Sequence, residues 1–327
     1  MDKKLDVTAL GELLIDFTRN AVSAQGNPLF EANPGGAPCN VLAMLQKLGR
    51  KTALISKVGK DMFGDLLCER AEREGIDLSG LARDEEIPTT LAFVQTFENG
   101  DRDFSFYRKP GADLMLNEAD VRKAEEKIKS AKIFHFGTLS MTGEPANEAS
   151  LTAIETAKEA GCLLSFDPNY RAPLWRYEEE AKEKILYGIE QCDILKISDN
   201  EIEFITGETD IEKGIGRILE KRQIPLVFAT LGPDGSMAFY GGKVFKKKGF
   251  SNPATIETTG AGDTFMACAL NGVLEHGGLD GLTEEEIDRT LSFANAAASI
   301  ITTRRGALSV MPEREEVEAF LKREGAY

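Results

Sequence analysis

Histidine is scarce in this sequence, with only His135 and His276 among 327 residues. With only two histidines, catalytic triads built on histidine and metal sites with several histidine ligands are nearly excluded. The five cysteines are widely spaced, odd in number and without a C-x-x-C pair, which is typical of reduced thiols in a reducing compartment. No stretch approaches the roughly 18 apolar residues of a membrane span, and the first residues lack a signal-peptide pattern. We therefore expect a cytoplasmic protein.

Positive charge is also in short supply, because 39 lysines and arginines face 54 aspartates and glutamates, leaving a formal net charge of -15. Such an acidic chain repels the phosphate backbone of nucleic acids and the anionic surface of a membrane, so we expect neither as a partner. A phosphate-bearing ligand would have to be bound by local backbone N–H groups and a few placed cations. The 42% of hydrophobic residues indicates a folded chain with a large core.

Short β-branched apolar stretches alternate with amphipathic helical patterns along most of the chain. This alternation is typical of βα units that feed a mostly parallel sheet. The expected strands are 51–58, 132–136, 163–166, 194–197 and 226–230, and the expected helices are 62–74, 146–160, 178–189, 211–221, 266–276 and 291–301. A hairpin is expected at 237–245, followed by an exposed lysine-rich edge at 246–248. We predict an α/β fold with a doubly wound, mostly parallel sheet flanked by helices, and ligands at the carboxyl ends of its strands.

Two segments, about 12–33 and 88–110, interrupt the alternation. The second contains two strand-like stretches on either side of Asn99-Gly100, which predicts a β-hairpin. We interpret both segments as a small β-lid over the ligand site of a single domain spanning residues 1–327. A lid of this kind exposes an apolar face and strand edges, so we expect a second copy of the chain to cover it in a homodimer.

The most informative motif is Thr258-Thr259-Gly260-Ala261-Gly262-Asp263, which stands directly before a helical pattern. Glycines at a helix start let a ligand approach the backbone, and the first N–H groups of the helix attract an anion. Phosphoryl transfer needs this anion stabilisation and also a base near the acceptor hydroxyl, which Asp263 could supply. On local chemistry alone, a plain helix cap explains the same residues equally well. The sequence has no P-loop motif, which disfavours a P-loop kinase.

A second motif, Gly35-Gly36-Ala37-Pro38-Cys39-Asn40, precedes another helical pattern near the start of the chain. Together the two motifs resemble the N-terminal and C-terminal signatures of the ribokinase-like (PfkB) family of carbohydrate kinases. The resemblance covers essentially the whole chain and favours the kinase interpretation over the cap. Within the family, the stretches 107–113 and 166–175 resemble fructokinases.

The resemblance implies a role for each matching position. Asp263 is the implied catalytic base, and we expect its place at a helix N-terminus to keep it ionised near pH 7. The implied anion hole consists of Gly260, Ala261, Gly262 and the N–H of Asp263. The implied substrate-binding residues are Asp16, Gly35, Gly36, Asn40 and Asp263, with Arg108 and Arg171 as candidate partners of an acidic substrate. The implied residues on the ATP side are Asn200, Thr230, Gly232, Gly235, Gly262 and Asn295.

The resemblance also implies metal ions. Asn200 and Glu203 match a family pattern that organises Mg²⁺, through water because Mg²⁺ dehydrates reluctantly. An Asn with a Glu three residues later is also a helix-capping arrangement, and this alternative stays open. Glu257 stands where many relatives have an Asp that binds a monovalent cation. The longer side chain leaves K⁺ binding an open alternative.

The expected activity is that of an ATP- and Mg²⁺-dependent fructokinase, which phosphorylates the 6-hydroxyl of D-fructose. The nearest alternative is a 2-keto-3-deoxygluconate kinase, because Arg108 and Arg171 would suit its acidic substrate. Ribokinase or another sugar kinase comes next. An alternative of a different class is a sugar-sensing protein without turnover, although such a protein has no need of a base at Asp263.

Overall fold

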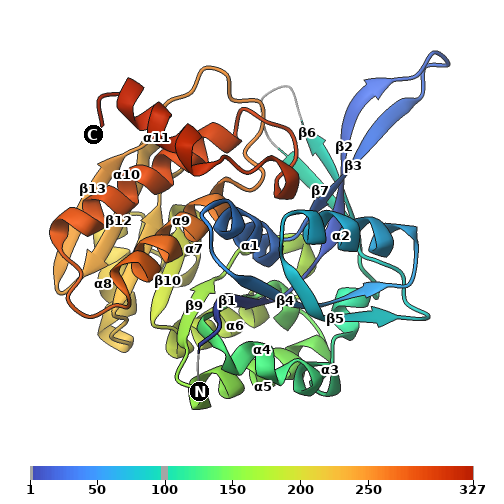
Figure 1. Ribbon diagram of the computed structural model, residues 1–327, viewed down its shortest axis with the longest axis horizontal. Coiled ribbons are helices and arrows are strands. Elements are labelled where there is room, and N and C mark those ends of the chain that lie inside the picture. Colours follow the sequence, from blue (N-terminus) through green and yellow to red (C-terminus); the bar gives the residue numbers. More distant parts are fainter. Residues whose placement is uncertain (1–2, 97–101, 327) are drawn as a thin grey trace.

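Nine strands form the main sheet of the computed structural model, which describes residues 3–96 and 102–326. Their order across the sheet is β13-β12-β11-β10-β9-β8-β1-β4-β5 (Figure 1). The strands from β11 to β5 in this order run parallel, and β12 and β13 are antiparallel to their neighbours. Their bounds are β1 Leu5–Leu10, β4 Thr52–Gly59, β5 Asp77–Asp84, β8 Ala131–Gly137, β9 Leu163–Asp167, β10 Ile194–Ser198, β11 Leu226–Thr230, β12 Gly235–Tyr240 and β13 Lys243–Lys248.

Helices cover both faces of this sheet and create a hydrophobic core on each side (Figure 1). One core contains α1 (Ala37–Lys47), α2 (Met62–Arg73), α9 (Ala261–His276), α10 (Glu284–Ile301) and α11 (Arg314–Arg323). The other contains α3 (Glu118–Lys123), α4 (Glu125–Lys129), α5 (Ala146–Glu159), α6 (Glu178–Gln191), α7 (Asp199–Thr206) and α8 (Ile211–Lys221). Successive strand residues point to opposite faces, so in β11 Phe228 enters the first core and Val227 and Ala229 the second. The predicted doubly wound α/β fold is confirmed.

A second sheet of four strands lies beside the main sheet, in the order β3-β2-β6-β7. It combines the hairpin of β2 (Leu14–Val22) and β3 (Pro28–Gly35) with the hairpin of β6 (Leu91–Thr96) and β7 (Arg102–Tyr107). Figure 1 shows β2 and β3 projecting beyond the body of the molecule. Both strand-rich segments predicted from the sequence are therefore present, while the Asn99-Gly100 turn lies outside the described residues.

The predicted hairpin near the end of the main sheet is also confirmed. Strand β13 is the last strand of the sheet, and its lysines pair with acidic residues on neighbouring helices. The pairs are Lys243 with Glu284, Lys246 with Glu212 and Lys247 with Asp288. Within the described ranges, no helix is long and apolar enough to cross a membrane.

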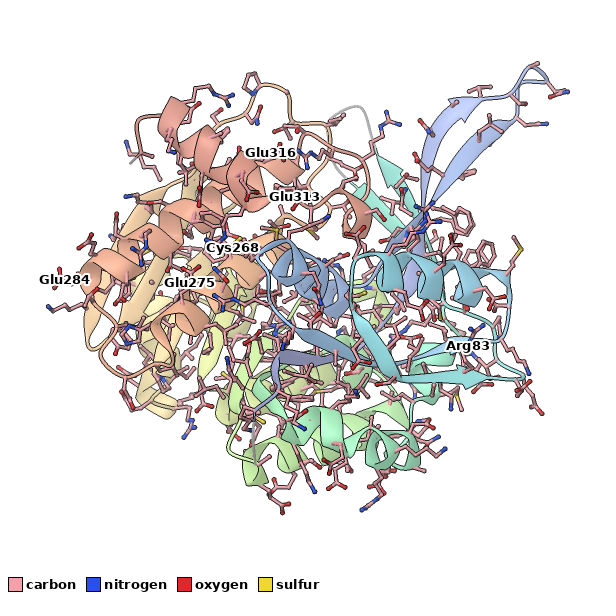
Figure 2. The ribbon with its side chains drawn as sticks, in the orientation of Figure 1. Arg83, Cys268, Glu275, Glu284, Glu313 and Glu316 are labelled. Carbon is pink, nitrogen blue, oxygen red and sulfur yellow. The ribbon has the colours of Figure 1, made fainter. Side chains whose placement is uncertain are left out.

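Ion pairs connect the end of helix α1 and the residues just after it to the C-terminal helices, and Figure 2 labels their acidic members Glu275 and Glu313. Lys47, in the last turn of α1, lies 2.9 Å from Glu313, and Arg50 lies 3.7 Å from Glu275 of α9. Ion pairs with a partly exposed member contribute little individually. The buried surface between α1 and α9 does more, and Leu42 and Leu270, for example, are fully buried there. The two glycine motifs predicted from the sequence, which begin α1 and α9, are thereby held together.

The structure contains shorter 3-10 elements at several loop positions. The elements are η1 (Ala112–Met115), η2 (Leu139–Met141), η3 (Ala172–Leu174), η4 (Gly232–Asp234) and η5 (Leu308–Val310). Three of them, η2, η3 and η4, follow the main-sheet strands β8, β9 and β11 and shape the carboxyl edge of that sheet.

Candidate active site

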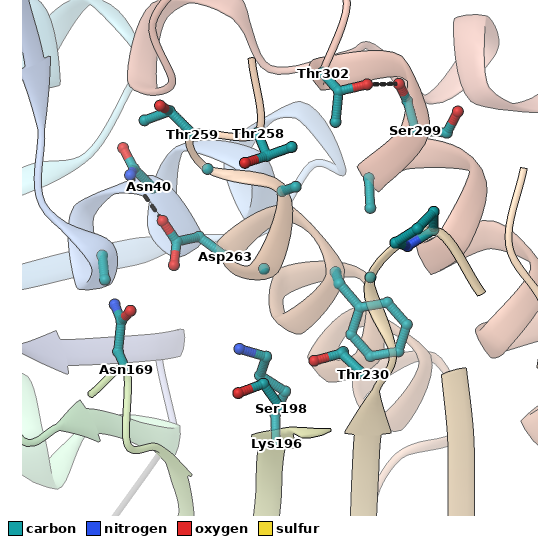
Figure 3. A pocket seen from close by; sticks show the side chains of 18 of the residues that line it. Asn40, Asn169, Lys196, Ser198, Thr230, Thr258, Thr259, Asp263, Ser299 and Thr302 are labelled. Atoms are coloured by element: carbon teal, nitrogen blue, oxygen red, sulfur yellow. Dashed lines mark hydrogen bonds between the residues drawn. The ribbon is translucent and has the colours of Figure 1, made fainter. Parts of the chain in front are cut away.

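A cavity of about 880 Å³ opens at the carboxyl ends of β10 and β11, where doubly wound sheets bind their ligands. One part is lined by residues near the start of the chain, including Glu12, Asp16 and Asn40. The other part is lined by the loop after β11 and by helix α10. The start of α9, with Asp263, lies between them (Figure 3). A cavity of this size and shape can hold two ligands at once, one on each side of Asp263.

Asp263 lies in the first turn of α9 and is 9% exposed. The Asn40 side-chain amide donates a hydrogen bond to one of its carboxylate oxygens at 2.8 Å (Figure 3). Helix α9 begins at Ala261, so the predicted start at Met266 is wrong by five residues. The reason is that Gly260 alone, with φ +77°, makes the turn, which leaves Gly262 inside the first helical turn.

Burial raises the pKa of Asp263 to about 6. The hydrogen bond from Asn40 lowers this pKa, the Asp167 carboxylate raises it, and the positive charges of Lys196 and Arg171 lower it. The prediction that the helix N-terminus keeps Asp263 ionised near pH 7 leaves out burial, which has the largest effect on this pKa. The carboxylate is still mostly ionised at pH 7 and can accept a proton.

We expect kcat/KM to fall about tenfold per pH unit below pH 6, because only ionised Asp263 can act as a base. A pH profile of kcat/KM measures this directly. Glu12 provides the control, since burial raises its pKa to about 7 and it lines the same cavity. In Glu12→Gln the acid limb should stay near pH 6, whereas a limb that vanishes in this variant would assign the titration to Glu12 instead.

The sugar-side residues predicted from the sequence converge where β2, β3 and α1 meet. Asp16, Gly36 and Asn40 line the cavity, and Gly35 lies behind Asp16, where a Cβ atom would stand 2.7 Å from the carboxylate. Asn40 has one buried side-chain oxygen without a described hydrogen-bond partner. A buried acceptor of this kind is available to a ligand hydroxyl.

Glu12 is a residue that the sequence analysis missed. It is 3% exposed, lines the cavity and accepts a hydrogen bond from the Ala37 N–H at 2.7 Å. Helix α1 has Gly36 as its N-cap and therefore no capping side chain of its own, so Glu12 satisfies this N–H from another segment. Its position two residues before the start of β2 at Leu14 was the available signal, but an acidic residue there is equally typical of an exposed turn.

The two predicted arginines have different surroundings. Arg108 is 5% exposed, forms a buried ion pair with Asp113 and also donates to Thr142 and to the carbonyl of Leu139. It does not line the cavity, so the expected contact with an acidic substrate is not supported. The physical reason is that Asp113, only five residues away, already neutralises its charge. Arg171 does line the cavity.

The predicted magnesium pair does not reach the cavity either. Asn200 and Glu203 are exposed on α7, whereas Ser198, Asp199 and Glu201 line the cavity. Two Ser/Asn-x-x-Glu patterns overlap here, and the helix uses the first, because Ser198 and Glu201 form a capping box. Glu201 also accepts the Tyr170 N–H at 2.8 Å, which fixes the loop that carries Arg171.

Apart from Asn200, the residues predicted for the nucleotide side lie on the other part of the cavity. Its lining includes Thr230, Gly232, Gly235, Gly262 and Asn295. The Asn295 side chain accepts from Ser236 at 2.9 Å and donates toward the backbone of β13, so it also joins α10 to the sheet. Glu257 is half-buried outside the lining and accepts the Gly306 N–H at 2.9 Å.

Lys196 and Asn169 are further cavity residues absent from the sequence-based set. Lys196 lies in the middle of β10 and pairs with Asp167 of β9 at 2.9 Å, with both side chains less than 10% exposed. Asn169 adopts a positive φ of 48°, which is uncommon for a residue other than glycine. Its neighbour Asp167 accepts the Asn169 N–H at 3.2 Å and so holds this loop in place.

Comparisons with known proteins agree with this geometry. The chain is 39% identical to probable fructokinase-2 of Arabidopsis thaliana, over 98% of this chain and 97% of that protein. It is 38% identical to fructokinase-2 of Solanum lycopersicum, over 97% and 96%. Among solved structures, a fructokinase from Xylella fastidiosa with bound ATP superposes with a TM-score of 0.88 at 28% identity, covering 98% of this chain and 99% of that one.

A fructokinase from Vibrio cholerae O395, solved with fructose, ADP and a calcium ion, gives a TM-score of 0.86 at 29% identity over 98% of this chain and all of that one. The family model of the pfkB family carbohydrate kinases matches residues 4–314. The paired glycine motifs, the buried aspartate between two parts of one cavity and these similarities agree, and the chain belongs to the pfkB family of carbohydrate kinases.

Proposed function

We propose that the protein is an ATP-dependent fructokinase, which transfers the γ-phosphoryl group of ATP to the 6-hydroxyl of D-fructose. The observation that carries this proposal is the position of Asp263, buried at the start of α9 between the two parts of the cavity. A base at this point can meet both an acceptor hydroxyl and a phosphoryl donor. Similarity to fructokinases over almost the whole chain supports fructose as the acceptor.

The roles of the residues follow from their places around Asp263. Asp263 accepts the proton of the 6-hydroxyl, and the backbone N–H groups of Gly260, Ala261, Gly262 and Asp263 stabilise the transferring phosphoryl. Asp16, Gly35, Gly36 and Asn40 form the sugar subsite, with Arg171 at its edge. Thr230, Gly232, Gly235 and Asn295 form the ATP subsite.

Mg²⁺ is part of the proposal as a companion of ATP. Within the described residues, no group of three or more metal-ligating side chains is present. This suits Mg²⁺, which is usually held by one or two carboxylates together with substrate phosphates and water. Asp199 and Glu201 line the cavity and would hold it, in place of Asn200 and Glu203. A role for K⁺ near Glu257 remains an alternative, and a solved Vibrio cholerae fructokinase binds a potassium ion.

The experiment that tests the substrate is a comparison of kcat/KM for D-fructose, 2-keto-3-deoxygluconate and D-ribose in one coupled assay of ADP release. We expect fructose to be preferred, because the buried Arg108–Asp113 pair leaves Arg171 as the arginine in the cavity. A preference of more than tenfold for the acid would replace the fructose assignment. Binding of fructose without ADP release would instead favour the sugar-sensing alternative.

The remaining expectations belong to the same proposal. The four-stranded second sheet acts as a lid that closes over the sugar and excludes water, which would otherwise take the phosphoryl group. Exposed apolar side chains on its hairpin, Val22, Leu29 and Phe30, support pairing of two subunits through this sheet. The single domain of residues 1–327 and a cytoplasmic location complete the proposal.

A further inference from the structure

We propose that Lys196 is a catalytic residue that binds the γ-phosphoryl group of ATP during its transfer. The inference rests on the proposed kinase function and adds a side-chain cation to an anion-binding turn made of backbone groups. Lys196 lines the cavity from the middle of β10, and Figure 3 shows its amine pointing toward the turn that carries Asp263.

The position of the ammonium group is fixed on two sides. On one side, Asp167 accepts a hydrogen bond from Lys196 Nζ at 2.9 Å. On the other side lies the first turn of α9, and a Cβ atom built on Gly262 would stand only 3.1 Å from Nζ. Glycine at 262 therefore leaves room for this ammonium directly beside the N–H groups that form the anion hole.

The charge of Lys196 is available to a phosphoryl group. An ammonium carries three N–H donors, and the described hydrogen bonds engage one of them, with Asp167. Burial acts to lower the pKa of Lys196, but the nearby carboxylates of Asp167 and Glu201 outweigh it and raise the pKa. The side chain is consequently charged throughout the working pH range.

The transfer step forms one bond at the γ-phosphorus and breaks another. A lone pair of the sugar 6-oxygen forms the new bond to the γ-phosphorus as the bond to the β,γ-bridging oxygen breaks, and that electron pair leaves on ADP. The hydroxyl proton passes to the Asp263 carboxylate. Negative charge on the three equatorial oxygens of the phosphoryl is matched by Lys196 and the N–H groups of α9. Asp167 is a positioning residue that aims Lys196.

The decisive measurement compares ADP with a non-hydrolysable ATP analogue, because the two differ in the γ-phosphoryl. In Lys196→Met we expect the Kd of the analogue to rise about tenfold or more, with a change of less than threefold for ADP. With a working sugar, kcat should fall about 10²- to 10³-fold, as for other donors to transition-state charge. Calorimetry without sugar gives the Kd values, so the outcome can be read even if fructose proves to be the wrong acceptor.

Because Lys196→Met leaves the Asp167 carboxylate buried and unpaired, this variant alone can lose stability. The double variant Lys196→Met/Asp167→Asn removes both charges, and it should recover the melting temperature without recovering kcat. The matched control is Lys57→Met/Asp120→Asn, which removes a similar pair with a 3.0 Å separation outside the cavity lining and should keep the analogue-to-ADP ratio. Recovery of kcat in the first double variant, or equal losses for ADP and the analogue, would overturn the proposal.

Discussion

Replacing Asp263 with Asn should remove most of the phosphoryl transfer and at the same time make the protein more resistant to heat. Loss of the base is expected to lower kcat about 10²- to 10⁴-fold. ATP binding should remain, because the N–H groups of α9 are unchanged. Steady-state kinetics and calorimetric binding of ATP test the two parts. An Asp263→Asn enzyme with near-normal kcat would contradict the assigned role.

The gain in stability follows from the pKa of Asp263. Burial raises it from 3.8 to about 6, and two pH units correspond to roughly 3 kcal/mol. As the pH rises, Asp263 ionises near pH 4 in the unfolded chain but only near pH 6 in the native protein. Its ionisation therefore lowers the free energy of unfolding. This loss is absent below about pH 4 and complete above about pH 6. Asp263→Asn should therefore raise the melting temperature at pH 7, with a gain that shrinks as the pH falls toward 4. A carboxylate with a purely structural role would show the opposite sign.

Replacing Gly36 with Ala should damage both stability and activity. Gly36 has φ +119°, and an added Cβ would stand 2.3 Å from the backbone oxygen of Glu12, which is buried and cannot easily move. Backbone strain alone costs about 1–3 kcal/mol, and the collision adds to it. The Asn40 N–H bonds to the Gly36 carbonyl at 2.9 Å, so a shift of Gly36 moves the partner of Asp263. A displacement of about 1 Å can lower the rate about 10²-fold.

The matched control is Gly49→Ala, just beyond the end of α1. Gly49 also has a positive φ, +76°, but an added Cβ there meets nothing within 4 Å. This variant should lose some stability through backbone strain and keep its kcat/KM. Melting curves and steady-state kinetics on both variants separate strain from collision, and equal kcat/KM in the two would show that Gly36 does not position the site.

Much of the fold could be predicted because the spacing of apolar residues alternates along the chain between the pattern of a strand and the pattern of a helix. Strand 226–230 and helix 211–221 match the structure residue for residue, since each is bounded by polar or turn-forming neighbours. The start of α9 could not be placed, because Gly262 discourages a helix in isolation. In the folded protein, packing of Phe265 and Met266 into the core overrides this preference.

Site residues were harder to predict from the sequence where an ion pair determines the role of the residue. Lys196 lies in an apolar strand, where a lysine normally indicates an exposed edge, and only the adjacent strand shows that Asp167 neutralises it. Arg108 is the opposite case. Its motif predicted a substrate-binding arginine, but in the structure Arg108 is buried in an ion pair with Asp113. In both cases the deciding partner is fixed by tertiary structure, which a one-dimensional pattern does not contain.

The lysine-rich strand β13 has a consequence for how copies of this protein avoid one another. An outermost strand offers its backbone groups as a template on which another chain can add, and this is a common start of aggregation. Four lysines within Lys243–Lys248 would have to approach the same charges of a second copy. Three of these lysines are already paired with Glu284, Glu212 and Asp288, so a strand adding at β13 would have to break these ion pairs or strip water from them, and this cost disfavours edge-to-edge growth of the main sheet.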